Sequence, residues 1–175
     1  MKTHSSYTEF FRDVAVRHKL ILHDVDPKKK SSFMRLVLGE TPFPSLDIVE
    51  FVQKTRSMIK PPFMLLQSRT NQYGQASDQW HKRPMGAFLI LDRPTKENDY
   101  DARDACITKC EGITEDIIGW MDNWFRVNYG LYTLNHNSIA SEVVGPIDGY
   151  WGVRVDFVYD VLGNGELTYD ANKFN

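Results

Sequence analysis

The chain has 175 residues, of which 42% are hydrophobic and 25% charged, and its formal net charge is −2. This length and composition are typical of one ordinary globular domain. A charge so close to neutral argues against a dedicated nucleic-acid-binding protein, which needs a basic surface to neutralise phosphates. The first eleven residues contain no apolar core of a secretory signal, and no apolar run approaches the roughly 20 residues that span a bilayer.

The N-terminal segment predicts a helix over residues 7–20. Ser6 and Glu9 have the spacing of a capping box, and apolar residues follow at helical spacing. The basic run at residues 28–30 is typical of a solvated turn, with a small phosphate- or acid-binding patch as the alternative.

The segment from residue 27 to residue 62 is ambiguous. Residues 33–39 fit either a strand or a short helix, whereas residues 46–58 predict a short amphipathic helix. Because a proline disfavours helix in the residue before it, Pro61 and Pro62 are expected to end that helix.

Two strands are predicted over residues 63–68 and 85–92. The second is almost entirely apolar, so we expect it to be central and covered on both faces. Residues 69–84 between them are polar with isolated aromatic residues, and they exceed what a hairpin connection needs. They predict a long inter-strand loop, and loops of this length are commonly functional.

The longest helix is predicted from Asp99 or Asp101 to about residue 130. Apolar residues three or four positions apart form one stripe along it: Ala102, Cys106, Cys110, Ile113, Ile117, Met121 and Trp124. The two cysteines lack further ligands nearby for a metal, so we expect them to be buried core residues. Gly112 and Gly119 are expected either to allow close packing on a sheet or to interrupt the helix.

The C-terminal part predicts a hairpin of residues 138–144 and 149–161, with a Gly- and Pro-rich turn between them and a polar tail at 163–175. Apolar residues alternate along the second strand, so one face is expected to pack on the long helix. The other face carries Arg154, Asp156 and Asp160 and is expected to meet water or another protein.

Because the strands occur in adjacent pairs, the expected fold class is α+β. We expect a mainly antiparallel sheet with the long helix packed on one face and an N-terminal helix, in a single domain over residues 1–175.

Sequence motifs of catalysis are missing. The chain has no phosphate-binding loop, no nucleophile elbow and no HExxH motif, so we expect neither enzyme activity nor a cofactor nor a metal. Asp78 with His81, and His23 with its neighbouring aspartates, are the candidate acid–base or metal pairs, and each lacks a third partner. Trp80 predicts either a binding anchor or a cover for the sheet edge.

The order of these elements resembles the tail terminator and tail completion proteins of long-tailed bacteriophages. These are small α+β proteins that form a ring at the head-proximal end of the tail. The resemblance covers residues 6–20 and 63–162 and is carried by SYTEFFRDVAVRHKL, FMLLQS, MGAFLILD, DARDACITKCEGITEDIIGWMDNWF and DGYWGVRVDFVYDV. These are matches of pattern and not of a specific motif. Residues 27–62 depart from the pattern, and another neck protein fits it equally well.

The resemblance implies a structural virion protein that has no catalytic residues and is assembled in the bacterial cytoplasm. It implies a homo-oligomeric ring, with a hexamer as one option, and contacts with other neck or tail proteins. A dedicated nucleic-acid or membrane partner is not implied. The implied subunit or partner interface is Arg69, Gln72, Tyr73, Trp80, His81, Lys82, Arg83, Arg154, Asp156 and Asp160.

Two alternatives remain open from the sequence. The first is a small cytoplasmic enzyme or ligand-binding domain that uses the loop around His81, and the second is a cytoplasmic adaptor unrelated to phages. The first alternative requires a concave pocket near His81 and Asp78.

Overall fold

A single mixed sheet organises the chain. The computed structural model describes residues 3–36, 44–76, 79–96, 98–129 and 134–162. In this part the strands run in the order β1-β2-β4-β6-β5, with β3 and β7 also paired to β4. The elements are α1 (His4–Arg17), β1 (Ser31–Leu36), α2 (Pro44–Thr55), η1 (Arg56–Met58), β2 (Ile59–Gln67), β3 (Thr70–Ala76), β4 (Gln79–Asp92), α3 (Tyr100–Tyr129), β5 (Leu134–Ile147), β6 (Tyr150–Tyr159) and β7 (Val161–Leu162).

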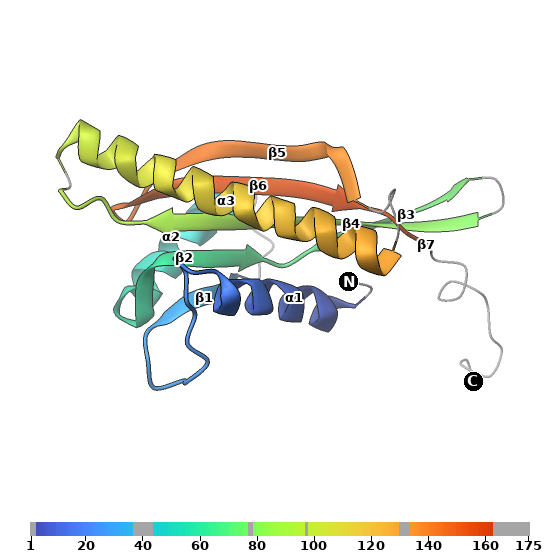
Figure 1. Cartoon of the computed structure of the whole chain (residues 1–175), viewed down its shortest axis with the longest axis horizontal. Coiled ribbons are helices and arrows are strands. Elements are labelled where there is room, and N and C mark those ends of the chain that lie inside the picture. Colours follow the sequence, from blue (N-terminus) through green and yellow to red (C-terminus); the bar gives the residue numbers. More distant parts are fainter. Residues whose placement is uncertain (1–2, 37–43, 77–78, 97, 130–133, 163–175) are drawn as a thin grey trace.

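The predicted α+β class is confirmed. Only β1 and β2 pair in parallel among the described strands, and the other pairs are antiparallel. The helices α1 and α3 lie on the same side of the sheet, and α2 lies on the other (Figure 1). Strand β2 and residues 86–92 of β4 are therefore covered on both faces, and for this part of β4 the apolar sequence predicts it.

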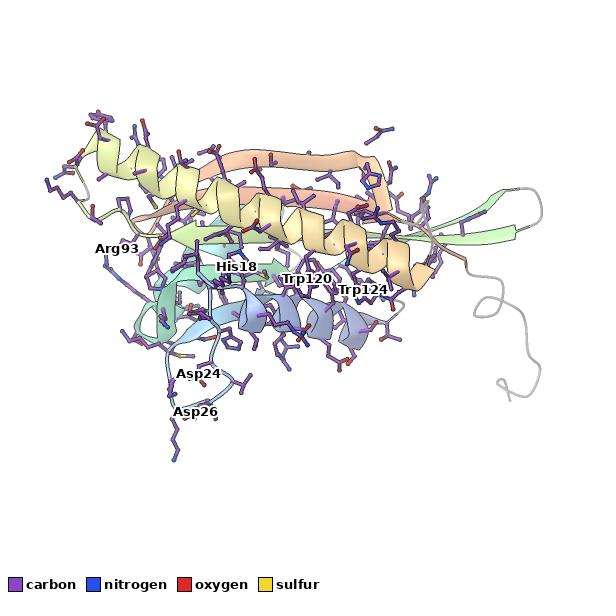
Figure 2. All side chains as sticks on the ribbon, viewed as in Figure 1. His18, Asp24, Asp26, Arg93, Trp120 and Trp124 are labelled. Carbon is purple, nitrogen blue, oxygen red and sulfur yellow. The ribbon has the colours of Figure 1, made fainter. Side chains whose placement is uncertain are left out.

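The larger core lies between the sheet and the helices α1 and α3. Alternate residues of β6, from Val153 to Val161 in β7, join the stripe of α3 in one apolar cluster that also contains Tyr7 and Phe11 of α1. Trp124 of α3 packs against Phe10 of α1 with their ring centroids 5.0 Å apart (Figure 2). The expected packing of the β6 face on the long helix is confirmed. Both cysteines are buried, and Cys110 belongs to this cluster.

A second, smaller core lies on the opposite face, beneath α2. It joins Ile48 and Val52 of α2 to Leu65 of β2 and Leu89 of β4, and it continues to Tyr150 at the start of β6. The helix predicted at residues 46–58 exists, but it ends at Thr55 and continues as a 3₁₀ turn. Pro61 and Pro62 do not end it, because they already lie within β2.

The helix boundaries follow their capping groups. Helix α1 begins at His4 because the Thr3 side chain accepts from the Ser6 backbone N–H, so the capping box lies three residues earlier than predicted. Helix α3 begins at Tyr100, where the Asp99 carboxylate accepts from the backbone N–H groups of Asp101 and Ala102. That agrees with Asp99 as the expected cap.

Two expectations about glycines and turns are wrong. Gly112 and Gly119 do not pack closely, because a Cβ at either position would meet no atom of a neighbouring element within 4 Å, and α3 runs through both without interruption. The turn expected at 145–149 is shorter, since β5 runs on to Ile147. The chain reverses at Asp148 and Gly149, whose φ angles of 51° and 81° are those of a tight two-residue hairpin turn.

The long loop expected at 69–84 is mostly a β-hairpin. Strand β3 pairs with β4 over consecutive positions from Thr70↔Met85 to Ala76↔Gln79. This hairpin extends beyond the helices at one end of the molecule (Figure 1). Since no helix covers it, its sequence lacks the apolar alternation that signals a strand. The tail at 163–175 lies outside the described residues.

Candidate functional site

The projecting hairpin is the main feature of the sheet that the packed cores do not explain. We refer to β3 and residues 79–85 of β4 as the arm. Residues 70–74 of β3 are all exposed. In the described part of the chain β3 pairs with β4 alone, so its other edge presents backbone N–H and C=O groups that the sheet does not use.

The base of the arm is tied to the end of β6 by two side-chain contacts. The Arg69 guanidinium donates to the Tyr159 hydroxyl at 2.8 Å, and Tyr159 is fully buried. The Arg83 guanidinium donates to the Asp160 carboxylate at 2.7 Å. Strand β7 adds backbone pairing to His81 and Lys82. A lone two-stranded hairpin is marginally stable in water, so the arm depends on these contacts at its base for its stability.

The exposed middle of the arm carries an aromatic and a basic side chain. Tyr73 and Lys82 are cross-strand partners, and the Lys82 ammonium lies 6.0 Å from the centre of the Tyr73 ring. That is within the range of a cation–π contact. Tyr73 is 55% exposed, and Gln72 beside it is exposed as well. The arm thus offers polar and aromatic groups next to an unpaired strand edge.

His81 lies in regular strand, opposite Gly74 of β3 and Leu162 of β7. The backbone of Trp80 pairs with that of Gln75, whereas its side chain lies outside the described residues. Asp78 also lies outside them. The anchor role of Trp80 and the His81–Asp78 pair therefore stay predictions.

The charged face of β6 forms a separate group. The Arg154 guanidinium makes two hydrogen bonds to the Asp156 carboxylate, at 2.7 and 2.8 Å, and Glu142 of β5 lies 3.8 Å away. The bond to Asp156 raises the pKa of Arg154. Asp160 instead pairs with Arg83 of the arm. The structure thus divides the predicted interface into the arm with Asp160 and an ion pair further along β6.

Metal and thiol chemistry find no support in the described part of the chain. It contains no group of three His, Cys, Asp or Glu side chains that could hold a metal ion. Burial raises the pKa of Cys106 to about 11 and also raises that of Cys110, so both thiols stay protonated at neutral pH. No described helix is long and apolar enough to cross a membrane.

Comparison with known proteins adds no relative, since no family model matches the chain and no curated protein or solved structure matches it significantly. A functional assignment therefore depends on the geometry of the arm and on the order of elements along the chain.

Proposed function

We propose that this chain is a structural subunit that assembles with copies of itself through the arm. One observation carries the proposal. The outer edge of β3 is seven residues long, contains no charge and no proline, and pairs with β4 without any irregularity of register. Such an edge is a template for pairing with another chain, and natural proteins usually block it with Lys, Pro or a bulge.

The other two edges of the sheet carry such blocks. Strand β5 has Pro146 and two irregularities of register against β6. Strand β1 has one irregularity against β2 and carries Arg35. The contrast supports β3 as the edge that is kept open for a neighbour. If the arm binds a different surface of the next copy, the contact is head-to-tail. Repetition of this contact forms a ring when the rotation between neighbours closes and a filament when it does not.

The finer proposal is a ring at the head-proximal end of a long bacteriophage tail, as a tail terminator, tail completion or other neck component. Its support is the resemblance in element order, which is an analogy of pattern. The arm occupies the position of the extended segment between the two central strands in that pattern. Within the described residues no observation favours the alternative of an enzyme that uses His81, and the cavities described there are not lined by this residue.

The test is the mass in solution, measured by light scattering over a range of concentrations and followed by negative-stain images. Gln72→Lys places a charge on the open edge and is expected to raise the concentration needed for assembly by about tenfold, equivalent to about 1.4 kcal/mol. Asn123→Lys adds the same charge on an exposed position of α3 and is the matched control. Equal assembly of the two variants, or a wild-type chain that stays monomeric throughout, would contradict the proposal.

Trp80 provides a second test of the same surface. If it is an interface anchor, Trp80→Ala should weaken assembly by about 2 kcal/mol or more while the melting temperature of the subunit stays the same. A sharp fall in that melting temperature would instead assign Trp80 to the core.

A further inference from the structure

A cavity between α1 and β1 gathers positive charge away from the arm. It has a volume of about 300 Å³ and is lined by Arg12, His23, Val25, Ser31, Phe33 and Arg35. We refer to it as the α1–β1 cavity. Figure 2 places the loop that carries Asp24, next to His23, at the opposite end of the molecule from the arm. This site is therefore independent of the proposed assembly surface.

The alternation of side chains along β1, together with α1 beside this strand, explains which residues line the cavity. Ser31, Phe33 and Arg35 are alternate residues of β1, so they share one face of that strand. The Phe33 ring joins the core under α1, and the Arg12 guanidinium lies 6.0 Å from its centre. The His23 ring lies 5.7 Å from the same ring. Phe33 is thus the apolar centre around which Arg12 and His23 gather.

The two arginines of this cavity lack the partners that most other arginines have. In the described part of the chain neither Arg12 nor Arg35 has a carboxylate within 4.0 Å. Six other arginines do: Arg17, Arg56, Arg83, Arg103, Arg126 and Arg154. Two uncompensated guanidinium groups that line one cavity leave it with a positive potential.

The third polar group of the cavity also lacks a partner. His23 Nδ1 is buried and has no hydrogen-bond partner among the described residues. Buried polar atoms are normally satisfied, so an orphan at a cavity wall points to a ligand that the protein alone does not supply. Burial and the charge of Arg12 lower the pKa of His23, while Asp24 opposes this, so the free imidazole is neutral at neutral pH.

We propose that the α1–β1 cavity binds a phosphoryl oxyanion between Arg12 and Arg35, with a ring nitrogen of His23 as a third donor. Guanidinium groups match phosphate oxygens with paired hydrogen bonds, and both charges would then be compensated. A volume near 300 Å³ is at the lower end for ligand pockets, which suits a phosphate group with a small substituent.

An adjoining cavity extends the basic surface. It has a volume of about 350 Å³, shares His23, Val25 and Ser31 with the first, and continues along residues 24–30 to Ser57 and Met58. Lys29 is paired with Asp24 at 2.6 Å, whereas Lys28 and Lys30 have no carboxylate within 4.0 Å in the described chain. The carboxylates of Asp24 and Asp26 also line this cavity, so its three lysines leave a net positive charge of one for a second phosphate on the same ligand.

The experiment is a calorimetric titration of the full chain with inorganic phosphate and, separately, with adenosine monophosphate, at constant ionic strength. Saturable binding is expected, and Arg12→Gln and Arg35→Gln should each weaken it by about tenfold or more. Arg17→Gln removes a charge from the same helix but outside the cavity and should leave the affinity within about twofold. Tighter binding of the monophosphate would identify an ester, and equal binding would identify the phosphate group alone as the ligand.

The NMR resonances of His23 report its pKa, which nonspecific attraction of phosphate to the protein surface would not change. A bound anion stabilises the imidazolium, so phosphate should raise the pKa of His23. Asp24 acts in the same direction, whereas the charges of Arg12 and Arg35 oppose it. No saturation, an equal loss in Arg17→Gln, or a pKa of His23 that phosphate leaves unchanged would each overturn the proposal.

Discussion

Strand β4 passes through two environments, and their difference separates the fold from the proposed assembly surface. Its inner half, residues 86–92, lies between β2 and β6, and the side chains from Ala87 to Leu91 are at most 5% exposed. Its outer half runs in the arm, where Arg83 and Met85 are exposed and His81 is half-buried. The inner half stabilises the fold through side-chain packing. The outer half is not covered by any described helix, so it contributes less to the core.

This difference predicts that substitutions in one half change stability and substitutions in the other change assembly. The two sets of variants therefore test the comparison directly. The expected effects on the free energy of unfolding fall from the centre of the sheet, through the base of the arm, to the outer surface of α3.

The largest effect is expected for Gly152→Ala. Gly152 of β6 pairs with Leu91 of β4, and a Cβ at this position would overlap the carbonyl oxygen of Ile90. Because that contact is with backbone, the two central strands must separate, and we expect a loss of about 3 kcal/mol or more in urea unfolding.

Gly74→Ala in the arm is the matched control for Gly152→Ala. A Cβ at Gly74 would meet no atom within 4 Å, so the free energy of unfolding should change by less than about 0.5 kcal/mol. Equal losses in the two variants would show that the arm is packed as tightly as the centre of the sheet.

The inner half of β4 was predictable from the sequence, and the arm was not. Burial on both faces of residues 86–92 and burial of one stripe of α3 impose apolar patterns that can be read directly, as at Cys110 and Ile117. No described helix covers the arm (Figure 1) and residues 70–74 are exposed, so its strands carry no such pattern and read as a polar loop. The Asp148–Gly149 turn had a recognisable signal, since Asp-Gly is typical of a two-residue hairpin turn.

The residues of the candidate site also differ in how far the sequence predicts them. The alternation along β6 placed Arg154 and Asp156 on the polar face, but it could not show that they bind each other. The Arg83–Asp160 contact joins residues 77 positions apart. The α1–β1 cavity combines a helix, a loop and a strand. Contacts of this kind depend on the tertiary arrangement, which no local pattern in one sequence contains.

An intermediate effect is expected at the base of the arm. Arg69→Met removes a charged donor from the buried Tyr159 hydroxyl, and loss of such a bond costs about 1.5–3 kcal/mol. Arg83→Met removes an ion pair with Asp160 whose arginine side chain is 60% exposed, so its expected cost is below about 1 kcal/mol. Urea unfolding measures both, and amide exchange should be faster in the arm of Arg69→Met. A larger cost for Arg83→Met would mean that the exposed pair, and not the buried hydroxyl, fixes the arm.

The buried thiols predict a pH dependence of the free energy of unfolding. The pKa of Cys106 is raised to about 11 by burial, so the folded state keeps a proton that the unfolded chain loses near its ordinary value of 9.0. The stabilisation is full below pH 9 and is lost as the pH rises towards 11, by about 1.4 kcal/mol per pH unit for each such group. Burial raises the pKa of Tyr7 as well, which acts in the same direction above pH 10.

Urea unfolding at pH 8 and pH 10 checks this window, with Cys106→Ala as the variant. If the alanine variant loses as much stability as the wild type over this interval, Cys106 is not the group that titrates.

A small effect of the opposite sign is expected for Gly119→Ala. A Cβ at Gly119 would meet no atom within 4 Å, so alanine adds no clash and only improves the helix propensity of α3. We expect a gain of about 0.5–1 kcal/mol in the free energy of unfolding, measured in urea. The contrasting variant is Gly86→Ala at the start of the inner half of β4. There a Cβ would lie 2.6 Å from the Phe157 ring and 2.8 Å from the Tyr7 hydroxyl, so a loss is expected. A loss in Gly119→Ala would mean that another surface covers this side of α3, and the helix would then belong to the assembly interface together with the arm.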